Sequence, residues 1–356
     1  MSAPTVTVAG EALVDVVLGD TVREVPGGSP ANVALGLARL GCDVEFATRL
    51  GDDERGRRIV DHLEASGVRF APGSLGADRT STATVRLGDG GQPRYEFDIV
   101  WDLADLPGTP AWLHVGSIAA FLRPGADTVL EAARRTAAAG GAVSFDPNVR
   151  PALLGSRSEA LARVEELAAL AAVVKLSDED AAWLWPGADP DAVLDRLLAL
   201  GAGLAVVTVG AGGSVLATEG ARVAVPAERT AVVDTVGAGD TYSAALVRQL
   251  TRQSDTQDDG PPHVRTRLRD LDHASLTELG RACSRAAAVT VGRRGADLPY
   301  TADLSTDADR SVDADRSVDA DRSANADRST GADRSTGADR STGADRSTDA
   351  PTTTVG

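Results

Sequence analysis

The sequence predicts an α/β fold in which a mostly parallel sheet is covered by helices on both faces. Mainly apolar runs of strand length alternate with segments of helical periodicity along most of the chain. A helix between two strands carries the chain back, so that the strands pair in parallel. Ligands of such folds bind at the carboxyl ends of the strands, and functional residues are therefore expected in the loops that follow them.

Six runs are expected to form the central sheet. They are TVTVAG (5–10), VEFATRLG (44–51), AWLHVGSIA (111–119), AVSFDP (142–147), AVVKLS (172–177) and LAVVTVG (204–210). Helical patterns lie between them at 29–41, 125–140 and 158–171. Strands with so few polar residues are typical of a sheet that is buried on both faces.

Two neighbouring segments break this alternation. TATVRL (82–87) and RYEFDIVW (94–101) alternate apolar and polar residues and are joined through the turn signal GDGG. This pattern predicts a half-buried antiparallel hairpin. With the stretches LVDVVLG and VREVPGG near the N-terminus, it is expected to form a small separate sheet, from about 12–26 and 80–101, that serves as a lid over a site. An edge hairpin without such a function is the alternative.

The C-terminal end has a different composition. From Ala302 to Asp349 eight related hexads follow one another, ADLSTD and then seven of the form A-D-R-S-x-x, with almost no apolar residue to bury. Such a segment cannot offset the entropy cost of folding. We expect residues 301–356 to be a disordered tail, an expanded repeat rather than a binding segment, and residues 1–300 to form the folded domain.

Composition excludes several classes of protein. The 356 residues carry a formal net charge of −16, which argues against nucleic acid or an anionic membrane as the main partner. No apolar run is long enough to span a membrane, and the N-terminus lacks the basic segment of a secretory signal. The two cysteines, Cys42 and Cys283, are expected to be reduced thiols of a cytoplasmic protein. Lys175 is the only lysine.

The stretch DTVGAGDTYSAAL (234–246) carries the strongest chemical signal. A glycine-rich turn leads into a helix whose first N–H groups could hold a phosphoryl group. The chain has no Walker P-loop, and Tyr242 stands where a dinucleotide fingerprint needs its third glycine. Asp240 is then placed to accept a proton from an attacking hydroxyl. A simple helix cap is the alternative, but a cap needs no preceding Gly-Ala-Gly.

Two further glycine clusters suggest the ligands. In PGGSPANVALGLARLG (26–41), Gly27 and Gly28 permit a close backbone turn and Asn32 offers both a donor and an acceptor. Together with Asp15 this mixed set suits the hydroxyls of a sugar. VTVGAGGSVLAT (207–218) suits the phosphates and ribose of a nucleotide, although a plain hairpin turn explains it almost as well.

Taken together, these motifs resemble the ribokinase-like (phosphofructokinase B) family of carbohydrate kinases, and within it bacterial fructokinases. The resemblance covers about residues 5 to 300 and rests on DTVGAGD, PGGSPANVALGLARLG, FDPNVR (145–150), KLSDED (175–180) and VTVGAGG. It implies a three-layer α/β/α sandwich with a small β-hairpin lid. It also implies an ATP-dependent kinase that transfers the γ-phosphoryl group of MgATP to a hydroxyl of a hexose, with fructose as the first choice.

The resemblance assigns roles to individual residues. It makes Asp240 the catalytic base and forms the anion hole from Gly237, Ala238 and Gly239. It places the sugar against Asp15, Gly27, Gly28, Asn32 and Arg150. It places the nucleotide against Lys175, Ser177, Thr208, Gly210, Gly213, Gly237, Gly239 and Ser284. The candidates for metal ions are Asp180, for magnesium, and Asp234 with the backbone around Val236, for a monovalent cation such as K⁺.

Ser177 and Asp180 depart from the pattern, because many members carry Asn-x-x-Glu there. Asp is one methylene shorter than Glu, which favours a water-mediated role beside the metal. The alternatives for function are a 2-keto-3-deoxygluconate kinase, a ribokinase or nucleoside kinase, a non-catalytic sugar sensor on the same scaffold, and a scaffold acting through its acidic tail. A homodimer formed through the lid is a further expectation.

Overall fold

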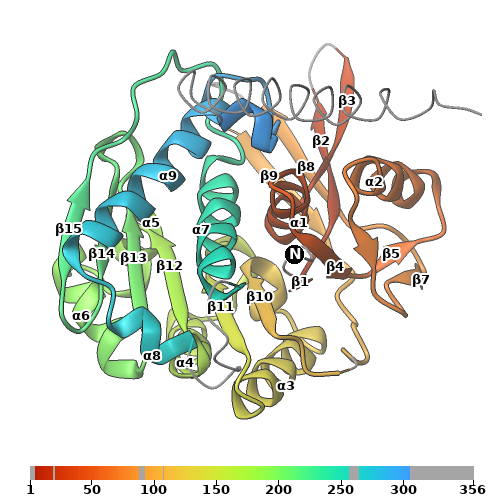
Figure 1. Cartoon of the computed structure of the whole chain (residues 1–356). Helices are drawn as coiled ribbons and strands as arrows, with labels where there is room; N and C mark the ends of the chain where they lie inside the picture. Colours follow the sequence, from red (N-terminus) through yellow and green to blue (C-terminus); the bar gives the residue numbers. More distant parts are fainter. Residues whose placement is uncertain (1–4, 19–20, 88–92, 107, 256–263, 305–356) are drawn as a thin grey trace, which may run out of the picture. The chain divides into compact units, whose positions relative to one another are not determined.

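Nine strands form the central sheet (Figure 1). The computed structural model describes residues 5–18, 21–87, 93–106, 108–255 and 264–304. Across the sheet the order is β15 (Arg222–Val225), β14 (Ser214–Ala217), β13 (Leu204–Thr208), β12 (Val173–Ser177), β11 (Ala142–Asp146), β10 (Trp112–Gly116), β1 (Thr5–Ala9), β4 (Asp43–Ala47) and β6 (Arg69–Phe70). The strands from β13 to β6 are parallel, and β14 and β15 are antiparallel to their neighbours.

All six predicted runs contribute a strand to this sheet, but one of them is divided. The run 44–51 leaves the sheet after Ala47, at the end of β4. Its last two residues form β5 (Leu50–Gly51), which pairs with β7 (Leu75–Ala77) in a separate two-stranded sheet. Apolar character alone could not reveal this break, because Leu50 is as fully buried as the strand residues before it.

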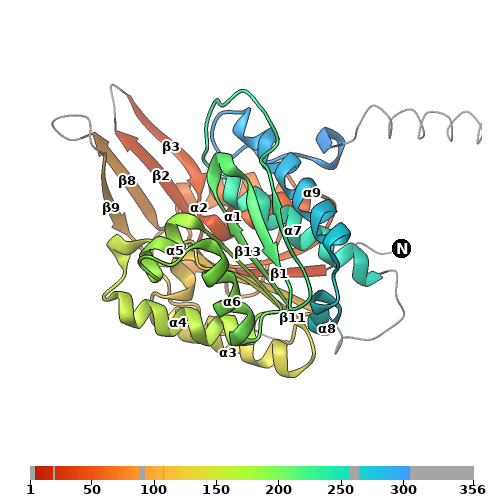
Figure 2. The ribbon, with the colours of Figure 1, turned by 90° about the vertical axis from the view of Figure 1, so that its left-hand side faces the viewer.

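Helices cover both faces of the central sheet, which confirms the predicted three-layer α/β/α fold (Figure 2). Two clusters of buried apolar side chains fill the space between the layers. One face is covered by α1 (Ser29–Arg39), α2 (Glu54–Glu64), α7 (Ala238–Asp255), α8 (Val264–Arg269) and α9 (His273–Val291). The other face is covered by α3 (Gly125–Ala138), α4 (Arg157–Leu170), α5 (Asp178–Leu184) and α6 (Pro190–Leu200).

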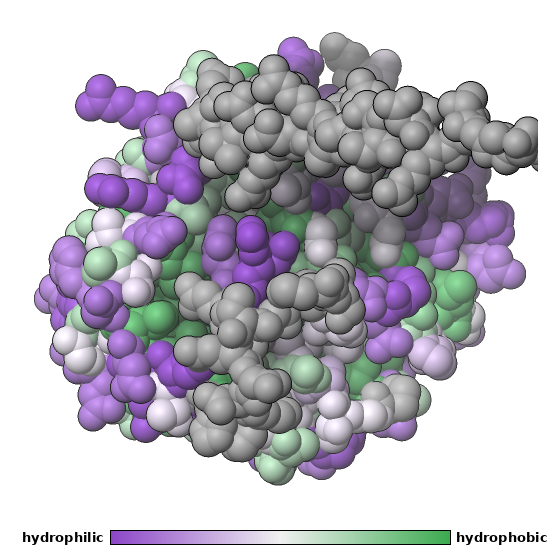
Figure 3. All heavy atoms as spheres, in the orientation of Figure 1, coloured by the Kyte–Doolittle hydropathy of each residue, from purple (hydrophilic) through white to green (hydrophobic). Residues whose placement is uncertain are grey.

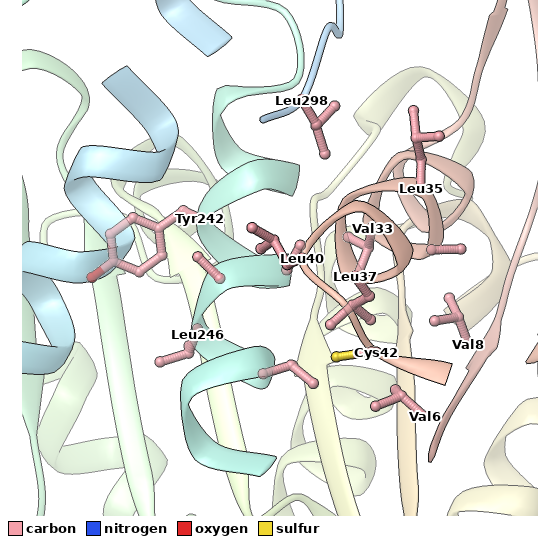
Figure 4. Close-up of a cluster of buried hydrophobic side chains, with 14 of the residues drawn as sticks. Val6, Val8, Val33, Leu35, Leu37, Leu40, Cys42, Tyr242, Leu246 and Leu298 are labelled. Carbon is pink, nitrogen blue, oxygen red and sulfur yellow. The ribbon is translucent and has the colours of Figure 1, made fainter. Parts of the chain in front are cut away.

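Helices α1 and α7 pack against each other on the same face of the sheet. A side chain at Gly36 of α1 would place its Cβ 2.8 Å from the Cβ of Ala244 on α7, so small residues allow the two helices to approach. Leu37 of α1 and Leu40, which directly follows the helix, fill the space beside α7 (Figure 4). This contact brings the first turns of α1 and α7 together, although they are about 200 residues apart in the chain.

The predicted second sheet is also present. It has four strands in the order β3 (Val22–Gly27), β2 (Leu13–Leu18), β8 (Thr82–Leu87) and β9 (Pro93–Asp98). Strands β8 and β9 form the predicted antiparallel hairpin, and β8 pairs in parallel with β2. Figure 2 shows these strands projecting beyond the central sheet. Val22 and Val25 on β3 are exposed.

The compact unit ends at Leu304 rather than at residue 300. Its last element is a short 3-10 helix, η5 (Thr301–Leu304), which carries Asp303. The carboxylate of Asp303 lies 3.1 Å from the guanidinium of Arg293. The predicted disordered tail, from residue 305 onward, lies outside the described residues.

Hydrophilic side chains cover much of the periphery of the face shown in Figure 3, and apolar ones are exposed in smaller areas between them. Within the described part of the chain, no helix has the length and apolar character needed to cross a membrane.

Candidate active site

The candidate site lies at the carboxyl edge of the central sheet, where the first turns of α1 and α7 meet. Strands β11, β12 and β13 end at Asp146, Ser177 and Thr208, three polar residues that follow apolar runs. Because parallel strands end at the same edge, these residues and the loops after them share one region of the molecule.

Asp240 lies in the first turn of α7, with 8% of its surface exposed. Its two carboxylate oxygens accept hydrogen bonds from α1, at 2.6 Å from Ser29 Oγ and 2.7 Å from Asn32 Nδ2. Burial raises the pKa of Asp240, and the two hydrogen bonds oppose this rise. A raised pKa makes the carboxylate a better proton acceptor. Asp240 and Asn32 are thus in direct contact, whereas Ser29 is a partner that the sequence did not identify.

The turn at residues 237–239, before Asp240, is called the anion-binding turn for the role that the sequence predicts. Gly237 has φ +80°, and a Cβ there would lie 2.8 Å from the Cβ of Ala296, so glycine is required. Ala238 N–H donates to the carbonyl of Thr235 at 3.2 Å, so it is engaged, unlike the free donor expected in an anion hole. The N–H groups of Gly239 and Asp240 precede the first intrahelical donor, and no acceptor for them is found in the described ranges.

The residues predicted to hold a sugar form a second group. The Asp15 carboxylate lies against Gly27, where a Cβ would come within 2.1 Å of Asp15 Oδ2. Gly28 precedes α1 with φ +102°, and a Cβ there would lie 2.7 Å from the carbonyl oxygen of Glu11. Burial raises the pKa of Asp15 to about 6, while the charge of Arg150 opposes the rise. Both glycines therefore allow the backbone to pass close to acidic residues.

Glu11 is a buried carboxyl that the sequence reasoning missed. It follows β1, has 2% of its surface exposed, and accepts a hydrogen bond from Ala119 N–H at 3.0 Å through Oε2. Burial raises its pKa to about 7. Ser117, whose side chain hydrogen-bonds to Glu11, has φ +53°, an uncommon conformation for a residue other than glycine. Glutamate inside an otherwise apolar stretch was the signal that could have identified it.

Asp180 is held by backbone groups. One carboxylate oxygen accepts from Val149 N–H at 2.7 Å and the other from Ser177 N–H at 3.1 Å. Ser177 Oγ in turn accepts from Asp180 N–H at 3.0 Å, which completes a capping box at the start of α5. No group of three or more acidic, histidine or cysteine residues in the described ranges could hold a metal ion. Because both carboxylate oxygens of Asp180 already accept from backbone N–H groups, this residue fits a water-mediated role beside a metal better than direct contact.

Lys175 is buried beneath the anion-binding turn. Its Nζ lies 2.8 Å from Asp146 Oδ2 and 3.3 Å from the carbonyl oxygen of Gly239. Ser243 of α7 donates to the same oxygen of Asp146 at 2.8 Å. The sequence predicted that Lys175 contacts the nucleotide, but it did not identify Asp146 or Ser243 as its neighbours.

The remaining residues predicted to bind the nucleotide or cation lie on separate elements. Thr208 Oγ1 is 3.4 Å from the carbonyl of Leu176, and Gly210 is exposed in η3 (Gly210–Gly212). A Cβ at Gly213 would lie 2.1 Å from a β15 carbonyl, so this glycine is needed for strand pairing. Ser284 Oγ accepts from Glu228 N–H at 2.7 Å. Asp234 accepts from the N–H groups of Val236 and Gly295, which lower its pKa.

Comparison with known protein families identifies the relatives of this chain. The model of the pfkB family of carbohydrate kinases matches residues 5–303. The chain belongs to this family. Among curated pfkB-type relatives, it is 36% identical over 256 residues to a fructokinase of Rhizobium leguminosarum bv. trifolii, covering 68% of this chain and 78% of that protein. It is 32% identical over 302 residues to an aminoimidazole riboside kinase of Salmonella typhimurium, covering 82% and 90%.

Solved pfkB-type structures show the same ribokinase-like fold. The fructokinase of Xylella fastidiosa with bound ATP superposes with a TM-score of 0.73 at 30% identity, covering 84% of this chain and 96% of that one. A double mutant of the fructokinase of Vibrio cholerae O395, in fructose, ADP and potassium ion bound form, gives a TM-score of 0.69 at 28% identity, covering 85% and 97%. The chain is therefore a carbohydrate kinase by family, and small molecules are the ligands of its solved relatives.

Proposed function

We propose that this protein is an ATP-dependent fructokinase in which Asp240 is the general base. The observation that carries the proposal is the placement of Asp240. Its buried carboxylate begins α7 beside two backbone N–H groups without an acceptor in the described chain. A base and an anion-binding turn in one position are what phosphoryl transfer to a hydroxyl requires.

In the proposed reaction, Asp240 accepts the proton of the attacking sugar hydroxyl. The sugar oxygen forms a bond to the γ-phosphorus of MgATP, and the bond from that phosphorus to the β-γ bridging oxygen breaks to release ADP. The N–H groups of Gly239 and Asp240 would donate to the transferring phosphoryl group. The Mg²⁺ that arrives with ATP neutralises phosphate charge. Ser29 and Asn32, at 2.6 and 2.7 Å, hold the carboxylate until the sugar replaces one of these bonds.

The other assignments support this reaction. Asp15, Gly27, Gly28, Asn32 and Arg150 are proposed to hold the sugar, and Ser177, Thr208, Gly210, Gly213 and Ser284 to surround the nucleotide. Lys175, which the sequence also predicts to bind the nucleotide, contacts the carbonyl oxygen of Gly239 in the turn that would face the phosphates. Asp180 would act on Mg²⁺ through water. Asp234, whose pKa is lowered by two backbone N–H groups and which is thus ionised, is proposed to help to bind K⁺. A structure of a related fructokinase described as bound to potassium supports this cation.

The four-stranded sheet is proposed to close over the sugar and to exclude water from the reaction, which limits ATP hydrolysis. Its strand β3 exposes Val22 and Val25, with 64% and 49% of their surfaces accessible. The two valines, three positions apart, point to opposite faces of the strand. The position of β3 at an edge of the described four-stranded sheet supports the proposal of a homodimer through this lid. Light scattering of wild type and of Val22→Asp/Val25→Asp would test it, since the variant should be monomeric if β3 forms the interface.

Fructose is the first choice of substrate because the curated relative at 36% identity is named a fructokinase. A nucleoside is the second candidate, favoured by the relative that is named an aminoimidazole riboside kinase. Ribose and 2-keto-3-deoxygluconate fit the same chemistry. An intact base and glycine turn argue against a non-catalytic sensor.

An ADP-release screen of purified protein with MgATP tests the proposal. The acceptors are fructose, ribose, 2-keto-3-deoxygluconate, adenosine and aminoimidazole riboside, and Asp240→Asn is the control. We expect the highest kcat/KM with fructose and almost no turnover in the variant. A preference for a nucleoside would reject fructose but keep the base, whereas near-normal turnover of Asp240→Asn would reject the mechanism.

A further inference from the structure

Lys175 is the one lysine among 36 basic residues, and it is buried beneath the turn that carries Gly239. Only 5% of its surface is exposed. It lies on β12, on the face of the sheet that α7 covers, opposite Asp146 on the neighbouring strand β11. This position separates it from arginines such as Arg57, Arg79 and Arg222, which form ion pairs at the surface.

The ammonium group of Lys175 is held by a buried partner. Its Nζ lies 2.8 Å from Asp146 Oδ2, and the two side chains are 7% and 4% exposed. Burial by itself lowers the pKa of Lys175, but the attraction of Asp146 outweighs it, so that the net pKa is raised. The lysine therefore stays positively charged inside the protein.

A second bond of the same ammonium reaches the anion-binding turn. Lys175 Nζ donates to the carbonyl oxygen of Gly239 at 3.3 Å. This carbonyl and the N–H of Asp240 belong to one peptide group. No carbonyl within the described segments accepts from that N–H, so it is available to an anion. A positive donor on one end of a peptide group polarises it and strengthens the N–H at the other end as a donor.

The surroundings of Nζ fit a lysine and not an arginine. A Cβ at Gly239 would lie 3.3 Å from Nζ, closer than ordinary van der Waals contact, so the ammonium lies directly against the turn. Asp146 occupies the other side. An ammonium is a compact point charge, whereas a guanidinium is a planar fork of larger size. A side chain at residue 239 would therefore press on the ammonium.

We propose that Lys175 is a positioning residue for phosphoryl transfer, which acts through the Gly239–Asp240 peptide group to strengthen the Asp240 N–H as a donor to the transferring phosphoryl group. The inference rests on the proposed function and adds to it a residue that would contact neither substrate but lies directly beneath the anion-binding turn. In this role Lys175 helps to stabilise the negative charge that develops on the phosphoryl group during transfer, and it does not contribute to the binding of ground-state ATP.

Two variants test this role. Lys175→Gln keeps a donor without the charge, on a side chain one bond shorter, and Lys175→Met/Asp146→Asn removes both buried charges together, which avoids an unpaired carboxylate. We expect kcat to fall about 10-fold or more in both, a fraction of the roughly 10²- to 10³-fold loss when a direct donor to an oxyanion is removed. KM for the sugar and for ATP should stay within about twofold, because ground-state contacts are intact.

The matched control is Ser243→Ala, which removes the other donor to Asp146 Oδ2 and leaves the charges unchanged. We expect its kcat to stay within about twofold of wild type. The decisive readout is calorimetric binding of ADP with aluminium fluoride and sugar, a mimic of the transferring phosphoryl group. The two lysine variants should bind this combination less tightly, in proportion to the loss in kcat, and bind ADP alone as wild type does.

Three outcomes overturn the inference. Unchanged kcat in folded Lys175→Gln would show a purely structural lysine, as would an equal loss in Ser243→Ala. A raised KM for ATP with unchanged kcat would show direct contact with the nucleotide. All measurements use the sugar that the acceptor screen selects, so a wrong substrate would appear first in the wild type and would leave this test intact.

Discussion

Helices α5 and α7 begin at the same edge of the central sheet, and each has an aspartate as its third residue, Asp180 and Asp240, yet these two aspartates are used in opposite ways. In α5, Asp180 turns back onto the backbone and accepts from the N–H groups of Ser177 and Val149. In α7, Asp240 turns away from its own helix toward Ser29 and Asn32 of α1. The N–H groups of Gly239 and Asp240 stay without an acceptor in the described chain.

This difference distinguishes a carboxylate that caps a helix from one that stands beside a helix end able to bind an anion. A capping carboxylate satisfies the free N–H groups of a helix and so removes the capacity of that helix end to bind an anion. When the carboxylate is held by another helix, the N–H groups remain available and the acid stands beside them. The contrast depends on the contact between α1 and α7, which a local sequence pattern does not contain.

The largest expected effect is on catalysis, from Asp240→Asn. We expect kcat to fall by roughly 10²- to 10⁴-fold, the usual contribution of a general base. The pKa of Asp240 is raised in the folded protein, so its ionised form destabilises the fold above that pKa. The thermal midpoint at pH 8 should therefore equal or exceed that of wild type. Steady-state kinetics and calorimetry check both, and a variant that is inactive because it is unfolded would contradict the prediction.

A second test alters the turn before α7 and leaves both carboxylates in place. Gly237→Ala forces a side chain into φ +80° and against Ala296. Such strain costs about 1–3 kcal/mol, and we expect a loss of stability in this range together with a fall in kcat. Denaturant unfolding and kinetics measure the two effects. Alanine at Gly187, which has φ +84° but open space around its Cβ, is the control and should leave kcat closer to wild type.

The third test uses Glu11, a buried carboxyl outside α5 and α7 that accepts from Ala119 N–H in the short 3-10 helix η1 (Ser117–Ala120). Its pKa is raised from 4.5 to about 7, so its contribution to stability is present below pH 4.5 and is lost as the pH rises through 7. Glu11→Gln should remove this loss. At pH 8 the variant should exceed wild type by up to about 3 kcal/mol, with little difference at pH 4.5. Urea unfolding of both proteins at pH 4.5 and pH 8 measures this difference. A stability difference that is the same at the two pH values would contradict the prediction.

Removal of the α5 cap should mainly affect stability. Asp180→Ala leaves the N–H groups of Val149 and Ser177 without their acceptor, and we expect a loss of about 1–3 kcal/mol because Val149 is buried. The kcat at saturating MgATP should change much less than in Asp240→Asn. A large rise in the Mg²⁺ concentration needed for half-maximal activity would instead favour the metal role predicted from the sequence.

The smallest effect is expected from Ser177→Ala, which removes the other half of the same capping box. Substitution of an N-cap serine by alanine costs about 1 kcal/mol. Thermal unfolding should show a small decrease in the midpoint, with kcat retained. A loss of activity comparable to that of Gly237→Ala would mean that the N-terminus of α5, like that of α7, acts on the phosphates.

The fold could be predicted because its information is local. Buried parallel strands such as β1, β10 and β13 are nearly continuous apolar runs, and the hairpin of β8 and β9 alternates as half-buried strands do. Where the pattern did not mark an end, as at Ala47, the prediction continued one strand into the next element.

The site could be predicted only in part, because its contacts join distant segments. The motif around Asp240 identified the base candidate, and that assignment stays a prediction. The partners of these residues were out of reach: Ser29 and Asp240 are 211 positions apart, and Lys175 and Asp146 are 29 apart. Helix packing and strand order create these pairs, and neither leaves a fixed spacing in the sequence.

The segment around Leu298 links the assembly of the site to the order of synthesis. The buried side chain of Leu298 lies close to Gly36, between α1 and α7 (Figure 4), and Arg39 of α1 donates to the Leu298 carbonyl at 2.6 Å. A nascent chain that ends before Leu298 already carries every signature motif, but it lacks the side chain that packs between the two helices. The contact between α1 and α7 is thus expected to become rigid only after Leu298 has been synthesised, so a product truncated before it would be exposed to proteases between these two helices.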